Sequence, residues 1–248
     1  MNTEVGKIGE LANLESFDPK AFEADEKVPQ DVCNFVLTLA VIFNDLKDLI
    51  YTHVLLQTQM PKGTFKITRH WGDYSGVYGH IVKVMLGLFR EIIWVIDKND
   101  KVLRNSFFQS VISSLNRKER GIWDSLVAMA QGKKPTTPEG RLAHKVRNKV
   151  AFHYDPKEIY RGHRTFFSSG SHGSERSFIS RGIGVKDTRL FFADAAVKGY
   201  VDSQMESDEK AILYKTLRLL LDSSILFKIV QNFIQKRRFT FRKETEEA

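Results

Sequence analysis

The chain has 248 residues, a formal net charge of +8 and a pI of about 9.4, and 42% of its residues are hydrophobic. This length suits one large helical domain with a real core, and the charge favours a polyanion such as RNA, DNA or an anionic membrane. The single cysteine, Cys33, excludes an intrachain disulfide and fits a reducing compartment. The start of the chain lacks a signal-peptide pattern, and charged residues interrupt every long apolar segment, so we expect a cytoplasmic protein with no membrane span.

The first half of the chain predicts helices. Residues 1–29 are polar and predict a loosely packed arm. Apolar residues then recur at three- and four-residue steps from Gln30 to Met60, and again from Gly76 to Asp97, which predicts two long helices. A polar connection containing Trp71-Gly72-Asp73 is expected between them. Shorter helices are predicted over 101–116 and 119–131.

The second half begins with a helix-start signal at Thr137-Pro138-Glu139, and this helix should stop before Pro156. Residues 156–189 lose the helical period and predict an irregular insert or a small β-hairpin. Within the insert we expect short strands around Thr165–Phe167, Ser177–Ile179 and Thr188–Phe192. A last helix is predicted from Ser207 to Arg237. The fold class is therefore an all-α helical bundle, with residues 30–248 as a single domain.

One segment carries residues able to do chemistry at an informative spacing. Arg147 is followed at once by Asn148, then by a short apolar run and His153. An arginine can neutralise a phosphate or a developing oxyanion, and a histidine can move a proton near neutral pH. On composition alone, however, the commoner arrangement is a surface arginine and a histidine held by a structural hydrogen bond.

On an ideal α-helix, His153 continues the apolar stripe of Leu142, Val146 and Val150, whereas Arg147 lies beside it. Six residues place Arg147 and His153 roughly 120° apart and ~9 Å along the axis. One helix alone therefore does not bring the two side chains together. A two-fold homodimer would do so, because its interface presents the same surface from both subunits.

The string Arg147-Asn148, four residues and His153, on a late helix of an all-α chain, resembles the HEPN superfamily. That family's signature is an arginine, a polar residue directly after it, and a histidine after a gap of four to six residues. The wider phrase around it looks like HEPN proteins of the abortive-infection type. One departure is that Tyr154 directly follows the histidine and Asp155 takes the position where toxins of this group often carry a tyrosine.

The resemblance implies a metal-independent endoribonuclease that acts as a homodimer in the cytoplasm, in a phage-defence or stress setting. His153 would be the general base or acid, Arg147 would hold the phosphate, and Asn148 would orient the substrate or a partner side chain. RNA is the implied substrate, and an antitoxin or regulatory protein is a further expected partner. The alternative is a non-catalytic HEPN module that binds RNA, a nucleotide or a protein through the same cleft.

Candidate substrate-binding residues lie in and after the motif. The insert interleaves cations with aromatic residues, a pattern that suits single-stranded RNA but also fits a solvated loop. Neither a metal nor an organic cofactor is expected, because no pair of histidines has ligand spacing with an acidic third residue and no nucleotide-binding glycine motif is complete. The substrate-binding candidates are Lys149, Tyr154, Arg161 and Arg164.

Overall fold

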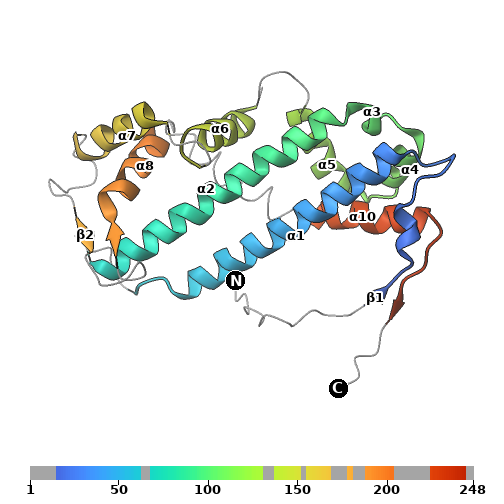
Figure 1. Ribbon diagram of the computed structural model, residues 1–248, viewed down its shortest axis with the longest axis horizontal. Coiled ribbons are helices and arrows are strands. Elements are labelled where there is room, and N and C mark those ends of the chain that lie inside the picture. Colours follow the sequence, from blue (N-terminus) through green and yellow to red (C-terminus); the bar gives the residue numbers. More distant parts are fainter. Residues whose placement is uncertain are drawn as a thin grey trace. The chain divides into compact units, whose positions relative to one another are not determined.

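The computed structural model describes residues 15–62, 68–130, 137–151, 155–168, 178–180, 188–203 and 224–243. In these ranges the chain is all-α with two short antiparallel strand pairs, which confirms the predicted fold class (Figure 1). The chain forms two compact units, each assembled from separated segments. The prediction of a single domain over 30–248 stays a prediction. Helices α1 (Gln30–Thr58) and α2 (Arg69–Lys98) are continuous and contribute to both units.

The first unit combines residues 1–48, 92–132 and 221–248. Its core is aromatic: the Phe108 ring packs edge-on against Phe35 at 5.4 Å and against Trp123 at 5.9 Å between ring centroids. Phe108 is fully buried because a ring of α1 and a ring of α5 both pack against it. Besides the ends of α1 and α2, the unit contains α3 (Asp100–Leu103), α4 (Ser106–Ser113), α5 (Arg117–Ala130) and α10 (Ser224–Lys236).

The helix predicted over 101–116 is divided in two. Its apolar period was correct, but the Asn105 side chain interrupts it. The Oδ1 atom of Asn105 accepts hydrogen bonds from the backbone N–H groups of Phe107 (2.9 Å) and Phe108 (3.2 Å). These bonds satisfy two of the donors that a new helix leaves unpaired, so α4 starts there.

The expectation of a loosely packed arm is wrong for the described residues 15–28. Strand β1 (Glu15–Ser16) pairs with β4 (Arg242–Lys243), and a short 3-10 helix, η1 (Pro19–Phe22), follows it. The Phe22 ring stacks on Phe233 of α10 at 5.3 Å, and Arg237 donates from Nε to the Ala21 carbonyl at 3.0 Å. Aromatic packing and one arginine therefore hold this polar segment in place.

The second unit combines residues 49–91 and 133–220. It contains the first part of α2, which begins earlier than predicted: Trp71, Gly72 and Asp73 are helical and not a connection. The Thr68 hydroxyl accepts from the Trp71 N–H at 3.2 Å and so caps the extra turn. The remaining elements are α6 (Pro138–Val146), η2 (Arg147–Ala151), α7 (Pro156–Ser168), β2 (Ile179–Ser180), β3 (Arg189–Leu190) and α8 (Phe191–Ser203).

The predicted insert is only partly irregular. Residues 156–168 form helix α7, so the strand expected at Thr165–Phe167 is wrong. The strand pair β2–β3 does form a small hairpin where strands were expected. It ends at Leu190, because Phe191 and Phe192 already belong to α8. Residues 204–223, which include the start of the helix predicted over 207–237, lie outside the described residues, and α10 accounts for its last part.

One arginine fastens the hairpin to α2. The Arg189 guanidinium donates to Asp194 of α8 from Nε at 2.8 Å and to Asp73 of α2 from Nη1 at 3.0 Å. It lies directly over Gly76, where an added Cβ would fall 1.9 Å from its nearest nitrogen. A larger residue at this position would have to displace the guanidinium from its place against α2.

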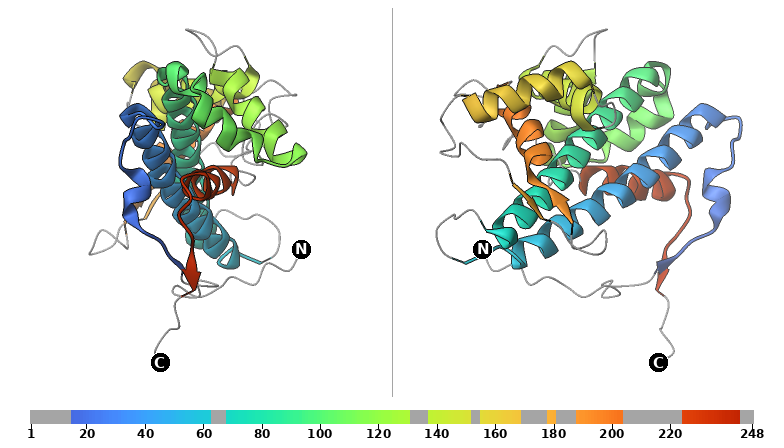
Figure 2. Two further views of the ribbon diagram at one scale, coloured as in Figure 1. Left: turned by 90° about the vertical axis from the view of Figure 1, so that its right-hand side faces the viewer. Right: turned by 60° about the vertical axis from the view of Figure 1, so that its left-hand side comes forward.

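Helices α7 and α8 lie side by side in every view (Figures 1 and 2). Two glycines make this contact possible. A Cβ added at Gly199 would lie 2.1 Å from the Gly162 carbonyl oxygen, and a Cβ added at Gly162 would lie 2.1 Å from the Ala196 carbonyl oxygen. Such backbone-to-backbone packing fixes α7 against α8.

The contact predicts a large effect of a single methyl group. Gly199→Ala should destabilise the protein by about 1–3 kcal/mol, because the methyl group overpacks a backbone contact. Gly79→Ala is the matched control, since an added Cβ in that part of α2 meets nothing within 4 Å. The control should stabilise by about 0.5–1 kcal/mol through helix propensity. Urea unfolding measures both, and equal effects of the two variants would contradict the described packing.

Candidate functional site

The motif begins at the end of α6 and continues as a π-helical turn. The helix starts where predicted: Thr137 caps it by accepting from the Gly140 N–H at 3.1 Å, and Pro138 is its first residue. Residues 147–151 then form the π turn η2, and such turns occur often at functional sites. The ideal α-helical geometry assumed for the motif is therefore wrong from Arg147 onward. His153 and Tyr154 lie outside the described residues.

A small apolar core holds the turn in place. Leu142 and Val146 are buried, as the predicted stripe requires, and they pack with Leu86 of α2 and Tyr200 of α8. Ala151, at the end of η2, packs against the same cluster. The motif is thus anchored on its apolar side by three other helices, because Ile159 of α7 also joins this core.

The first residue of the turn, Arg147, is held by a carboxylate of α2. Arg147 donates from Nε to Glu91 Oε1 at 3.0 Å and from Nη1 to Asn148 Oδ1 at 2.9 Å. About a third of each charged side chain is exposed, 33% for Arg147 and 36% for Glu91. The guanidinium therefore has a fixed orientation and remains accessible from solvent.

A second histidine, His144, belongs to this cluster. The Asn148 amide nitrogen lies 3.0 Å from Nε2 and 3.3 Å from Nδ1 of its ring, and Arg90 donates from Nε to Nδ1 at 3.4 Å. An arginine and an amide nitrogen can only donate, and a neutral imidazole has a single accepting nitrogen, so Nδ1 accepts from Arg90 and Asn148 while Nε2 carries the proton. This arrangement requires a neutral imidazole.

The electrostatics agree with a neutral ring. Burial lowers the pKa of His144 below its ordinary value of 6.5, and the positive charges of Arg90 and Arg147 lower it further. The neutral form of His144 is consequently favoured over the charged form. The neutral Asn148 side chain stands between this ring and the Arg147 guanidinium and is hydrogen-bonded to both.

Lys149 and Asp155 connect the turn to the next helix. The Lys149 Nζ atom lies 2.6 Å from Asp155 Oδ2, and the hydrogen bond raises the pKa of Lys149 and lowers the pKa of Asp155. Asp155 Oδ1 accepts from the N–H groups of Lys157 (3.1 Å) and Glu158 (3.4 Å), which caps α7. Of the substrate-binding candidates, Lys149 is therefore already engaged in an ion pair that joins η2 to α7.

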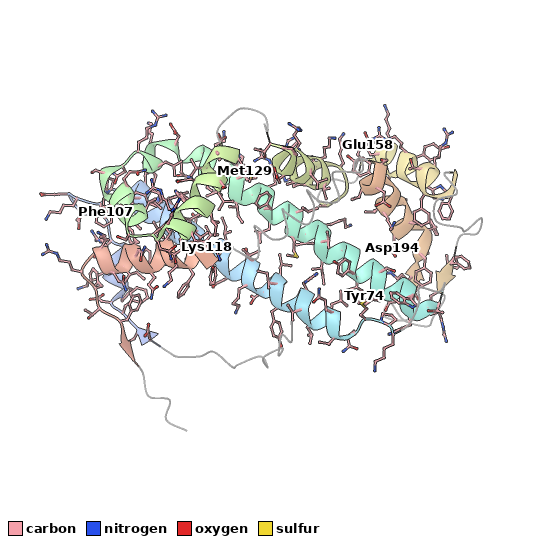
Figure 3. All side chains as sticks on the ribbon, turned by 180° about the vertical axis from the view of Figure 1, so that it is seen from behind. Tyr74, Phe107, Lys118, Met129, Glu158 and Asp194 are labelled. Atoms are coloured by element: carbon pink, nitrogen blue, oxygen red, sulfur yellow. The ribbon has the colours of Figure 1, made fainter. Side chains whose placement is uncertain are left out.

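The two remaining candidates lie on α7. Arg161 pairs with Glu158 at 2.7 Å, and its guanidinium carbon lies 5.7 Å from the centre of the Tyr200 ring. Arg164 is exposed one turn further along the helix. Figure 3 labels Glu158 in the first turn of α7, close to the end of α6. The assignment of these arginines to substrate binding stays a prediction.

Sequence reasoning missed His144, Arg90 and Glu91. The spacing of His144, Arg147 and Asn148 is i, i+3, i+4, which places side chains on one helix face and was a usable signal. Arg90-Glu91 was noticed only as an interruption that prevents a membrane span. A charged pair in the middle of an apolar helix stripe is also a sign of buried polar partners.

Within the part of the chain that the structure describes, no three His, Cys, Asp or Glu side chains gather in a way that could hold a metal ion. The described helices include none with the length and apolarity of a membrane span. Comparisons of the chain with protein-family models, with curated proteins and with solved structures returned no match. The HEPN resemblance therefore stays a prediction that rests on Arg147, Asn148 and His153.

The site makes a pH prediction for His144. NMR titration should give a midpoint below 6.5, and Arg90→Gln should raise it by removing one positive charge. Since the folded protein holds this proton more weakly than the unfolded chain, His144 costs stability as pH falls below 6.5 through the folded pKa. His144→Gln should therefore flatten the pH dependence of unfolding in that window.

Resolving the His144 resonance by its loss in His144→Gln separates it from His53 and His80, whose pKa values burial also lowers. A midpoint at or above 6.5 would contradict the neutral ring described above.

Proposed function

We propose that this protein is an endoribonuclease of HEPN type that cleaves RNA without a metal ion. The observation that carries the proposal is the fixed, accessible guanidinium of Arg147, held by Glu91 and joined to Asn148. In the proposed reaction the ribose 2′-hydroxyl attacks the adjacent phosphorus and the bond to the 5′-oxygen breaks. The products are a cyclic phosphate and a 5′-hydroxyl. The need for a 2′-hydroxyl restricts the substrate to RNA.

Arg147 has the role that its geometry supports best. A guanidinium has five N–H donors in a planar fork that matches phosphate oxygens, and the bonds to Glu91 and Asn148 fix the plane of that fork. Because Glu91 fixes the group in advance, it can stabilise charge that develops on the phosphate without reorganising. Removing one preorganised donor of this kind from an enzyme active site typically costs about 100- to 1,000-fold in rate.

Proton transfer is assigned to His153, as the resemblance implies. It would take the proton of the 2′-hydroxyl, or return one to the departing 5′-oxygen. Asn148 supports this chemistry as a positioning residue, because its amide connects the Arg147 guanidinium to the His144 ring. A two-fold homodimer, with the motifs of two copies facing each other, is part of the proposal. So are a cytoplasmic setting in phage defence or stress and control by an antitoxin or regulatory protein.

A second candidate function is a non-catalytic RNA-binding module. One observation favours it: the motif side chains are satisfied within the chain, Arg147 by Glu91 and Lys149 by Asp155. A network of this kind would also form if the motif served only to hold η2 in place. The two candidate functions are distinguished by one measurement, because only the nuclease yields cleaved RNA.

The test uses purified full-length protein and a mixed-sequence RNA in excess EDTA. The wild-type protein should cleave it, and mass spectrometry should find cyclic phosphate and 5′-hydroxyl ends. His153→Ala should lose about 100-fold or more of the rate, and Arg147→Ala should lose a similar factor. Arg147→Lys retains the charge but not the fork, so it should recover only part of the loss.

Arg117→Ala is the control, because it removes the same group from an exposed position at the start of α5. It should cleave at the wild-type rate, and circular dichroism should show that all variants are folded. RNA bound but left intact in EDTA would support the binding module. Cleavage that survives His153→Ala would contradict the proposed site.

A further inference from the structure

The outer face of α7 carries a regular stripe of cations around one tyrosine. Lys157, Tyr160, Arg161 and Arg164 follow the spacing i, i+3, i+4, i+7, so they share one face of the helix. All four are exposed. We call these residues the α7 stripe. From Lys157 to Arg164 it extends about 10 Å along the helix axis.

Tyr160 is the unusual member of the stripe. Its side chain is 65% exposed, more than any other large hydrophobic residue in the described ranges. The apolar side of α7 does not need it, because Ile159 reaches the core and Gly162 packs on the α8 backbone. Because this ring is not used in the packing of α7, both of its faces can be offered to a ligand that stacks on aromatic rings.

Of the three cations around Tyr160, only Arg161 is paired with a carboxylate of the described residues. Arg161 is paired with Glu158 and stacked over Tyr200, which fixes its position. No hydrogen bond or ion pair within the described ranges engages the side chain of Lys157 or that of Arg164. Three cations against one carboxylate leave the stripe with a positive charge, which fits a polyanion.

We propose that the α7 stripe binds single-stranded RNA, with a base stacked on Tyr160 and phosphates held by Lys157, Arg161 and Arg164. Exposed aromatic rings stack on any base, and cations at their sides follow the backbone, which is how proteins hold unpaired strands. A duplex hides its base faces and offers Tyr160 no partner. The preference for RNA over DNA rests on the proposed nuclease function, whereas the stacking and the charge do not.

The position of the stripe agrees with that role. Asp155 caps the first turn of α7 and binds Lys149 of η2 with its second oxygen, so the start of the stripe is tied to the motif turn. Only three residues, 152–154, separate η2 from Asp155. A strand on α7 therefore runs toward the turn that carries Arg147, and the stripe would hold the substrate while the motif acts on it.

Fluorescence anisotropy with a 12-nucleotide 2′-O-methyl RNA tests the proposal, because this strand lacks the attacking hydroxyl and cannot be cleaved. Tyr160→Ala should weaken binding about tenfold, the loss of one stacked base, whereas Tyr160→Phe keeps the ring and should bind within twofold of wild type. The double variant Lys157→Ala/Arg164→Ala should lower the slope of log K against log salt by about 1.4, since each phosphate contact on a single strand contributes about 0.7.

Lys118→Ala/Arg117→Ala removes two exposed cations from α5 and is the matched control, with the wild-type salt slope expected. Equal binding by Tyr160→Ala and wild type, or tighter binding of duplex RNA than of the single strand, would overturn the stripe. A DNA strand that binds as tightly as RNA would overturn only the preference for RNA. Binding that depends on the stripe, without cleavage of ordinary RNA, would contradict the proposed nuclease function and support the RNA-binding role of the stripe. Cleavage of ordinary RNA that Tyr160→Ala leaves unaffected would support the nuclease function and contradict the role of the stripe.

Discussion

The candidate site depends on one ion pair, between Arg147 at the start of a π turn and Glu91 on α2. The pair fixes the guanidinium, and the guanidinium in turn fixes the Asn148 amide, which reaches the ring of His144. An arginine on a helix surface ordinarily samples many rotamers, and ordering it costs entropy. Here the carboxylate of a second helix offsets that cost, so the donors are in place before any ligand arrives.

The surrounding packing is arranged so that this turn can be irregular and still rigid. Its apolar side rests on Leu142, Val146 and Tyr200, and its far end is joined to α7 through Lys149 and Asp155. Helix α7 is itself locked to α8 by the close contact of Gly162 and Gly199. A π turn widens the helix and releases backbone groups, and it persists only where neighbouring contacts hold it. These contacts therefore hold the motif turn in a fixed position, and they hold the cations of α7 in a fixed position relative to it.

The sequence predicted the helices whose apolar period was strong. It predicted both long helices, the start at Thr137 and the buried stripe of Leu142 and Val146, because periodicity and capping are local signals.

The sequence did not predict helix α7 over residues 156–168, because Pro156 was interpreted only as the end of the preceding helix. Asp155, Pro156 and Glu158 form the same kind of helix-start signal that was recognised at Thr137. The face of α7 that packs against α8 carries a glycine, Gly162, in place of an apolar side chain, so the apolar period was not visible in the sequence. The partners of Arg147 could not be predicted, since Glu91 is 56 residues away and no local pattern reports such a pairing. The π turn could not be predicted from the sequence either, because it depends on tertiary contacts.

A double-mutant cycle for Glu91 and Arg147 tests this account most directly. Urea unfolding of Glu91→Ala, Arg147→Ala and the double variant would give the coupling free energy between the two side chains. The account predicts a favourable coupling of about 0.5–1 kcal/mol, as for a partly exposed pair with good geometry, and a coupling that weakens with salt. Effects that add to within about 0.3 kcal/mol at every salt concentration would show that Glu91 does not hold the arginine, and the preorganised site would be contradicted.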